Sequence, residues 1–313
     1  MKKDTIVIGT RSSKLALWQA EYIQSRLEEQ YPGLKVELKK MTTKGDKILD
    51  APLAKIGGKG LFTKELEMDM LSGGIDLAVH SLKDMPTELP AGLCLTAVTK
   101  RFDPGDAVVS PEFKTLENLP QGAKVGTSSL RRKAQLLHVR PDLNICDLRG
   151  NVNTRLAKLE SENFAAIILA VAGLKRLGFG DRITEVLPRE MVLPAVGQGA
   201  LAIETRADDT EMRELLAFLN DEATVQCTRA ERAFLGRVEG GCQVPVGVYA
   251  VPDTQPEHIV VEAVIASLDG QRLYRDKISG LATEAEALGV ELAEKLLAAG
   301  GEEILQEIGL LQN

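Results

Sequence analysis

The sequence predicts an α/β protein with more than one domain and a smaller α+β domain at its C-terminal end. In roughly the first two hundred residues, short β-branched or apolar runs alternate with helical patterns, which is typical of α/β domains. After Asn220 the pattern changes to strands followed by one long helical segment, which is typical of an α+β domain. A length of 313 residues is sufficient for two or three domains with buried cores.

Strands are predicted where β-branched or apolar residues follow one another between turn signals. These segments are residues 5–8, 35–41, 75–80, 124–126, 144–147 and 165–171, and then residues 247–250 and 259–267. Helices are predicted where apolar residues recur three or four positions apart. These segments are residues 13–30, 63–71, 130–137 and 149–159. A last helix is predicted at 283–299, with a capping box formed by Thr283 and Glu286 and an end at Gly300.

Two loop-like segments, residues 100–106 and 193–199, enclose about a hundred residues, as expected for one domain inserted into another through two crossings. We therefore expect three domains. They are an α/β domain of residues 1–99 and 200–219, an inserted basic α/β domain of residues 100–199, and an α+β domain of residues 220–313.

The composition is that of a globular protein, with 44% hydrophobic and 27% charged residues. The net charge of -7 argues against a protein that coats nucleic acid or an anionic membrane. Aromatic residues make up only 4%, too few for a surface that stacks single-stranded nucleic acid. We find no signal-like region or membrane-length apolar stretch. These features predict a cytoplasmic protein without nucleic-acid or membrane partners.

The charge is unevenly distributed along the chain. Residues 124–176 contain ten basic and four acidic residues, a local charge of +6, whereas residues 201–313 carry a local charge of -12. With so few aromatics nearby, the basic middle segment is expected to bind small anions.

Three predicted strand-to-helix junctions combine small hydroxyl residues with arginine. They are residues 9–14, 126–132 and 148–155. Backbone N–H groups and the helix dipole favour an anion at a helix N-terminus, and arginine adds a planar fork that matches a carboxylate. At any one junction the hydroxyl can instead be an ordinary helix cap and the arginine solvated. Three such junctions in one chain favour anion binding.

The sequence contains no Walker A loop, no dinucleotide fingerprint and no cluster with the spacing of a metal site. The nearest to a phosphate loop is residues 55–60, whose lysines and glycines fit a mobile cationic loop better.

Asp84 follows a predicted strand directly after Lys83, so its carboxylate is a candidate for acid–base work or for stabilising a cation. It can also be a turn or capping residue. His80, within the strand, is expected to be a packed residue.

Cys242 lies in the segment Gly240-Gly241-Cys242-Gln243-Val244-Pro245, which predicts a tight exposed turn. Its thiol is a candidate functional group, although a purely structural role is about equally compatible with this position. The other cysteines, Cys94, Cys146 and Cys227, lie in strand or helix patterns and are expected to be small apolar residues.

Taken in order and over essentially the full length of the chain, these segments resemble the sequences of the porphobilinogen deaminase (hydroxymethylbilane synthase) family. The Gly-Thr-Ser-Ser-Leu-Arg-Arg run at 126–132 and the Gly-Gly-Cys-Gln-Val-Pro run at 240–245 are the most specific. The other matching stretches are residues 9–13, 55–62, 76–86, 148–155, 170–178 and 193–199.

The resemblance implies an α/β fold of three domains, the first two like the lobes of type II periplasmic binding proteins and the third a small α+β domain. It implies a dipyrromethane cofactor that the enzyme makes from its substrate and attaches through a thioether to Cys242. It implies a monomeric transferase of tetrapyrrole and heme biosynthesis. That enzyme condenses four porphobilinogen molecules head to tail, with release of ammonia, into the linear tetrapyrrole hydroxymethylbilane.

The resemblance also implies the roles of individual residues. Asp84 is the catalytic carboxylate, because loss of ammonia leaves an electrophilic azafulvene whose positive charge a carboxylate stabilises. The cofactor is bound by Ser13, Lys83, Thr127, Ser129, Arg131, Arg132 and Arg155, in addition to Cys242. The substrate, which carries an acetate and a propionate, is bound by Arg11, Arg149, Arg155, Arg176 and Gln198. A mobile cationic loop contains Lys55, Lys59 and Phe62.

The alternative is a two-lobed carboxylate-binding protein without catalysis, since paired lobes suit that use equally well. Such a protein needs the arginine junctions but has no use for the Gly-Gly-Cys segment or for a third domain.

Overall fold

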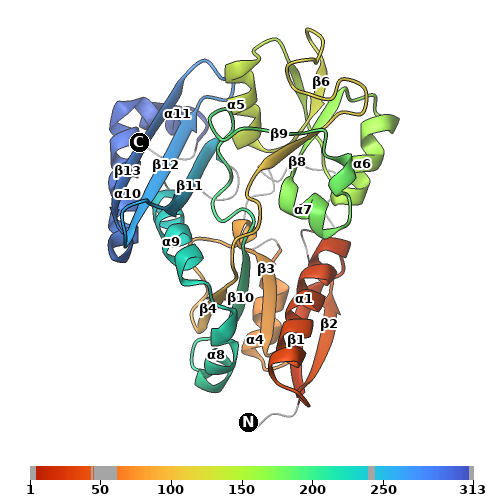
Figure 1. The fold of residues 1–313 in the computed structure, drawn as a ribbon, viewed down its shortest axis with the longest axis vertical. Helices are drawn as coiled ribbons and strands as arrows, with labels where there is room; N and C mark the ends of the chain where they lie inside the picture. Colours follow the sequence, from red (N-terminus) through yellow and green to blue (C-terminus); the bar gives the residue numbers. More distant parts are fainter. Residues whose placement is uncertain (1–4, 44, 46–61, 239–243, 310–313) are drawn as a thin grey trace. The chain divides into compact units, whose positions relative to one another are not determined.

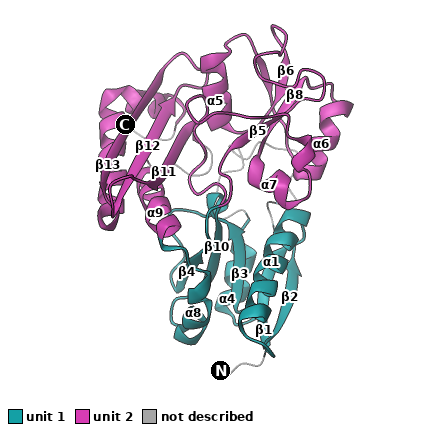
Figure 2. Ribbon diagram, viewed as in Figure 1, with its two compact units in different colours: residues 1–101, 200–222 teal, residues 102–199, 223–313 magenta. Residues whose placement is uncertain are grey.

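The computed structural model describes residues 5–43, 45, 62–238 and 244–309. The chain forms two compact units, which Figure 2 distinguishes by colour. Unit 1 contains residues 1–101 and 200–222, and unit 2 contains residues 102–199 and 223–313.

Unit 1 is built on a mixed sheet with the strand order β2-β1-β3-β10-β4 (Figure 1). β1 is parallel to β2 and β3, whereas β10 runs antiparallel to β3 and β4. The strands are β1 (Thr5–Arg11), β2 (Lys35–Met41), β3 (Leu77–Ser81), β4 (Leu93–Val98) and β10 (Leu201–Arg206). The helices are α1 (Lys14–Gln30), α4 (Lys64–Leu71) and α8 (Thr210–Leu216), with single 3-10 turns η1 (Leu82–Asp84) and η3 (Ala217–Leu219).

Helices cover both faces of this sheet. Ile23 of α1 packs with Ile6 and Ile8 of β1 in one buried cluster. Met70 of α4 belongs to a second cluster, against which Val7 of β1 packs. Because successive side chains of a strand point to opposite faces, Val7 and its neighbours place α1 and α4 on opposite sides.

The first sheet of unit 2 repeats this arrangement, with the strand order β7-β6-β8-β5-β9. β6 is parallel to β7 and β8, and β5 is antiparallel to β8 and β9. The strands are β5 (Asp106–Val109), β6 (Lys124–Gly126), β7 (Asn144–Cys146), β8 (Ala166–Ala170) and β9 (Glu185–Val186). The helices are α5 (Leu130–Val139), α6 (Val152–Ser161) and α7 (Val171–Arg176), with a 3-10 turn η2 (Gly180–Arg182).

Two buried clusters again lie on opposite faces of the sheet. Leu136 of α5 packs with Val108 and Ile168, and Leu156 of α6 packs with Val109 and Ile167. Neighbouring residues of β5 and of β8 therefore point to opposite helical layers, as in a doubly wound α/β domain.

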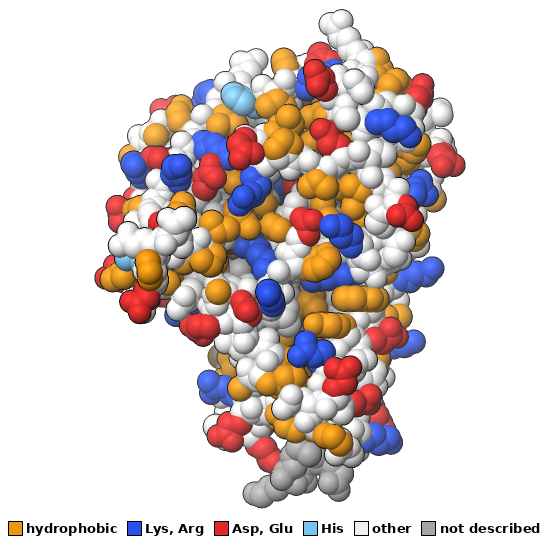
Figure 3. Space-filling model, in the orientation of Figure 1, with side chains coloured by type: hydrophobic (Ala, Val, Ile, Leu, Met, Phe, Trp, Pro, Cys, Tyr) orange, Lys and Arg blue, Asp and Glu red, His pale blue; other side chains and the backbone are white. Residues whose placement is uncertain are grey.

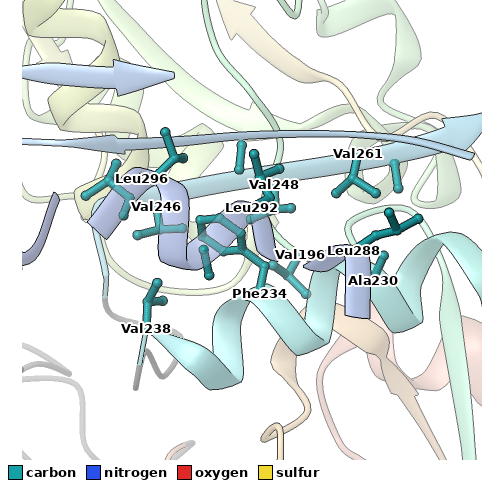
Figure 4. Packing of buried hydrophobic residues seen from close by; sticks show 14 of the residues in the cluster. Val196, Ala230, Phe234, Val238, Val246, Val248, Val261, Leu288, Leu292 and Leu296 are labelled. Atoms are coloured by element: carbon teal, nitrogen blue, oxygen red, sulfur yellow. The ribbon is translucent and has the colours of Figure 1, made fainter. Parts of the chain in front are cut away.

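Unit 2 also contains an antiparallel sheet with the order β11-β12-β13, packed against helices. Its strands are β11 (Val246–Pro252), β12 (His258–Ala266) and β13 (Leu273–Leu281). The helical segments are α9 (Glu222–Arg237), η4 (Ala282–Glu284), α10 (Ala285–Leu296), a π-helical turn η5 (Leu297–Gly301) and α11 (Glu302–Glu307). Figure 4 shows Phe234 of α9 pointing toward Val248 and Leu292 in this core.

The predicted fold class of α/β lobes and a smaller sheet-and-helix body is confirmed. β1 is longer than predicted, because its register with β2 continues to Arg11 opposite Met41. The predicted capping box is wrong: Thr283 lies in a 3-10 turn, and the residue that flanks α10, Glu284, makes no side-chain cap hydrogen bond. The proposed helix end is confirmed at Gly300, whose φ of 123° interrupts the helix. The division into domains 1–99 with 200–219, 100–199 and 220–313 stays a prediction.

Candidate active site

In unit 1, two of the predicted site segments follow neighbouring parallel strands. β1 ends at Arg11 and β3 ends at Ser81, and the two strands pair through Ile8 with Leu77 and Gly9 with Ala78. Their carboxyl ends therefore lie at the same edge of the sheet. The chain order reverses between these strands, with β2 beyond β1, and such a switch point is where open α/β sheets bind ligands.

The β1 end presents a cation and a helix N-terminus. Ser13 is the N-cap of α1, and its Oγ accepts a hydrogen bond from the backbone N–H of Ala16 at 3.3 Å. The guanidinium of Arg11 lies over the ring of Phe62, 4.3 Å from its centroid. Because an aromatic face attracts a cation, this contact orients Arg11 without using its N–H donors.

The β3 end presents Lys83 and Asp84 on the turn η1. Asp84 is exposed and makes no hydrogen bond or ion pair within the part of the chain that the structure describes. Lys83 is half-buried and has an interaction partner. An unpaired carboxylate at the switch point of the sheet is free to interact with a bound cation.

In unit 2, the equivalent switch lies at the end of β6, which pairs with β7 and β8. The chain continues from β6 into Thr127, Ser128 and Ser129, each of which accepts a backbone hydrogen bond through its hydroxyl. Ser129 is the N-cap of α5. A hydroxyl that accepts a backbone N–H still has its own proton to donate, so this loop offers hydroxyl donors beside a helix N-terminus.

The loop after β7 contains Arg149 and leads into α6. The Nη1 atom of Arg149 is buried and has no hydrogen-bond partner among the described residues. Because a buried N–H group without an acceptor is costly, this atom indicates a missing anionic partner. Arg155 of α6 donates from Nε to the backbone carbonyl of Gly150 at 2.8 Å, which fixes its guanidinium against the same loop.

Arg131 and Arg132 form a buried ion-pair cluster with Asp106, the first residue of β5. Arg131 Nη1 donates to Asp106 Oδ2 at 2.6 Å, and Arg132 donates to Asp106 Oδ1 from Nε at 3.0 Å and from Nη2 at 2.6 Å. Burial would raise the pKa of Asp106, but the charges of the two arginines outweigh it and hold the pKa well below its usual value. Removing one member of such a buried cluster costs about 3–5 kcal/mol.

Further hydrogen bonds connect this cluster to the segment that contains Gln198. Gln198 is buried, and its Nε2 donates to Asp106 Oδ1 at 3.0 Å and to the carbonyl of Pro104 at 2.6 Å. The carbonyl of Leu193 accepts from Arg131 at 2.7 Å. Arg176 donates from Nη2 to the carbonyl of Gly199 at 2.8 Å. Gln198 and Arg176 therefore both donate hydrogen bonds to backbone carbonyl groups.

Some predicted residues cannot be placed, and others were not anticipated. Cys242, Lys55 and Lys59 lie outside the described residues. Asp106 was not predicted, because it follows Asp103-Pro104-Gly105 and its partners are 25 and 26 residues away in the chain. The face drawn in Figure 3 shows acidic and basic side chains interspersed, rather than a field of one sign.

The three cysteines within the described residues lie in regular elements. Cys227 is buried in α9, and Cys94 and Cys146 are half-buried in β4 and β7. This is the environment expected for small apolar side chains.

Two sequence profiles match the chain in succession. The profile described as "Porphobilinogen deaminase, dipyromethane cofactor binding domain" matches residues 6–214. The profile described as "Porphobilinogen deaminase, C-terminal domain" matches residues 225–298. The chain belongs to the porphobilinogen deaminase family. The family predicted from the sequence motifs is confirmed for residues 6–214 and 225–298.

Curated members of the porphobilinogen deaminase family match almost end to end. The porphobilinogen deaminase of Geobacter sulfurreducens is 56% identical over 308 residues, which cover 98% of this chain and 96% of the relative. That of Moorella thermoacetica is 56% identical over 304 residues, which cover 97% and 96%. Both relatives carry the name of the family.

Solved structures with similarity to this family member include two binding proteins. A methionine-binding protein aligns with a TM-score of 0.44 at 18% identity, covering 69% of this chain and 89% of that one. The periplasmic aliphatic sulphonate-binding protein of Escherichia coli aligns with a TM-score of 0.39 at 15% identity, covering 75% and 70%. Among the described residues, we find no helix with the length and apolar character needed to cross a bilayer.

The cofactor named by the family profile, a dipyrromethane, agrees with the donors present in unit 2. Dipyrromethane units built from porphobilinogen carry carboxylates, and these need charged or hydroxyl donors. The buried Nη1 of Arg149 lacks an acceptor among the described residues, and the hydroxyls of Thr127 and Ser129 retain their protons. The residues of unit 2 therefore fit a polycarboxylate group.

Proposed function

We propose that this chain condenses four porphobilinogen molecules head to tail, with release of ammonia at each step, into hydroxymethylbilane. The observation that carries this proposal is the match to both domains of the porphobilinogen deaminase family along nearly the whole chain. A carboxylate-binding protein without catalysis has no need of the C-terminal domain that matches at residues 225–298. The transferase is therefore the better account of the chain as a whole.

We assign the binding of carboxylates to donors at the strand ends, on the helices α5, α6 and α7, and in the segment before β10. In unit 2 these donors are Thr127, Ser129, Arg131, Arg132, Arg149, Arg155, Arg176 and Gln198, and in unit 1 they are Arg11, Ser13 and Lys83. Each hydrogen bond between a charged donor and a carboxylate contributes about 1.5–3 kcal/mol. Lys55, Lys59 and Phe62 remain assigned to a cationic loop, of which Phe62 contacts Arg11.

Asp84 is assigned the catalytic role. Loss of ammonia from porphobilinogen leaves an azafulvene, in which positive charge is delocalised through the pyrrole nitrogen. A carboxylate that makes no ion pair with the described residues stabilises that charge and accepts or returns a proton at the pyrrole N–H. Asp84 meets this requirement because it is exposed at the end of β3 and pairs with no described residue.

The dipyrromethane, when bound, supplies the free pyrrole α-carbon from which the chain of pyrroles is extended. We assign its thioether to Cys242. Val238 and Val244, the described residues nearest to Cys242 in the sequence, are both buried in the core formed by α9, α10 and the sheet β11-β12-β13.

The test of the function uses intact-mass spectrometry and a product assay. We expect the purified chain to carry a mass increment of two pyrrole units, to turn pink-red with Ehrlich's reagent and to convert porphobilinogen into hydroxymethylbilane. Cys242→Ser should lose all three properties, whereas Cys146→Ser, at a half-buried strand position, should keep them. An unmodified, inactive parent chain from porphobilinogen-replete cells would contradict the proposal. The prediction of a cytoplasmic monomer remains a separate expectation.

A further inference from the structure

Asp106 is a fully buried carboxylate that the proposed mechanism does not use. It accepts hydrogen bonds from Arg131, Arg132 and Gln198, which come from the start of α5 and from the segment before β10. Its side chain is 0% exposed, and those of both arginines are 6% exposed. The carboxylate therefore fixes three residues that are assigned to cofactor or substrate binding.

The geometry determines which donors of each arginine remain for a ligand. Arg131 directs Nη1 to Asp106 and to the carbonyl of Leu193, which occupies both protons of that nitrogen. Its Nε and Nη2 have no acceptor among the described residues. Arg132 donates hydrogen bonds from Nε and Nη2 to Asp106 and from Nη1 to the carbonyl of Ile168. The two guanidinium groups are thus held with one side toward Asp106.

The same carboxylate also sets the charge of the cluster. Two arginines and one ionised aspartate carry a single net positive charge. A single carboxylate neutralises that charge, whereas two arginines alone would require two. Because the cluster is buried, where unbalanced charge is costly, this difference decides how many carboxylates it can accept.

We propose that Asp106 is a positioning residue for cofactor binding, which orients Arg131 and Arg132 and limits them to one carboxylate of the dipyrromethane. This inference rests on the proposed function, because the ligand is the cofactor of that function. Asp106 acts through the arginines and touches no reacting atom.

The experiment compares full-length Asp106→Asn and Asp106→Glu with the parent protein. Each is purified without cofactor, given porphobilinogen well below its own unfolding midpoint, and followed by intact-mass spectrometry as the cofactor becomes attached. We expect attachment to slow by about tenfold or more in both variants, the effect of losing one charge-assisted hydrogen bond. Asp106→Glu keeps the charge and moves the carboxylate by one methylene, so it separates position from charge.

The matched control is Asp142→Asn, which removes an aspartate paired with Arg140 at the other end of α5. We expect its attachment rate to stay within about twofold of the parent, since this half-buried pair lies at the C-terminal end of α5, away from the N-cap Ser129. If Asp106→Glu folds like the parent and attaches cofactor at the parent rate, the proposal is wrong. If neither Asp106 variant folds, Asp106 serves only the stability of the lobe, and the proposal is equally overturned.

The same measurements separate this inference from the proposed function. A parent chain that gains no mass from porphobilinogen contradicts the function itself. A parent that gains the mass, with variants that gain it equally fast, contradicts only the role of Asp106.

Discussion

Arg155 donates from Nε to the backbone carbonyl of Gly150 over 2.8 Å, so the position of its guanidinium depends on the conformation of that glycine. Gly150 has a φ of 118°, a backbone conformation that residues with a Cβ atom rarely adopt. A Cβ at this position would lie 2.7 Å from Cγ2 of Thr154. Glycine is therefore required between Arg149 and the N-cap of α6, Asn151.

We expect Gly150→Ala to destabilise unit 2 by about 1–2 kcal/mol through backbone strain. We also expect it to raise KM for porphobilinogen, because it displaces the loop that holds Arg149 and Arg155. Gly122→Ala is the control, since Gly122 has a φ of 73° but no atom within 4 Å of an added Cβ. Thermal unfolding and steady-state kinetics measure the two effects. An unchanged KM in a folded Gly150→Ala protein would show that the loop does not bind substrate.

Asp84→Asn should retain the cofactor and lose nearly all turnover. The amide keeps the shape of the side chain but cannot stabilise a developing positive charge. The measurements are the mass of the purified protein and kcat for porphobilinogen. Asp181→Asn is the control, because Asp181 is also an exposed aspartate in a 3-10 turn. A kcat near that of the parent for Asp84→Asn would remove Asp84 from the mechanism.

The parts of the fold that could be predicted from the sequence are those with a local signal. β2 and β6 have the predicted bounds. In β2, Val36 and Leu38 alternate with charged residues, which is the local pattern of a half-buried strand. β5 was missed, since only four residues of strand follow a Pro-Gly turn. β13 was missed because most of its side chains are half-exposed and include charged residues, so its place is decided by pairing with β12.

The site could be predicted to a similar extent. The arginines and hydroxyls at strand ends have a local pattern. The structure places Ser13 and Ser129 at helix N-caps, the role that the sequence left open as the alternative to anion binding. Asp106 has no such pattern, because its role depends on contacts with residues distant in sequence. A buried carboxylate after a loop is recognisable only once the arginines that neutralise it are known.

Glu231 of α9 is a second buried carboxylate without a local signal, and we expect Glu231→Gln to destabilise unit 2. Glu231 is 0% exposed, and its two oxygens accept the backbone N–H groups of Gly197 at 2.7 Å and Ala250 at 2.8 Å. A glutamine would turn an NH2 group toward one of these donors, at a cost of about 1–3 kcal/mol.

Chemical unfolding measures this effect, with Glu291→Gln, at an exposed position of α10, as the control. The control should change the free energy of unfolding by no more than about 0.5 kcal/mol. Equal stability of the two variants would mean that the two N–H groups find other acceptors.

The pH dependence of the stability of unit 1 should reflect two buried acidic side chains, Glu67 and Glu204, that interact with His80 of β3. His80 Nε2 lies 3.0 Å from Glu204 Oε2, and both side chains are buried, as expected for His80 as a packed strand residue. Burial raises the pKa of Glu67 on α4 above 4.5, and the charge of Glu204 acts in the same direction. The folded protein therefore keeps the Glu67 proton to a higher pH than the unfolded chain does.

Because the folded state binds more protons in this range, the free energy of unfolding should fall as the pH rises from about 4.5 through the raised pKa of Glu67. Glu67→Gln imitates the protonated side chain and should remove this loss. As the pH increases, we expect the unfolding midpoint of Glu67→Gln to rise relative to that of the parent. Glu160→Gln, at an exposed position of α6, should follow the parent at every pH. A constant difference between Glu67→Gln and the parent across the range would show that folding does not raise the pKa of Glu67.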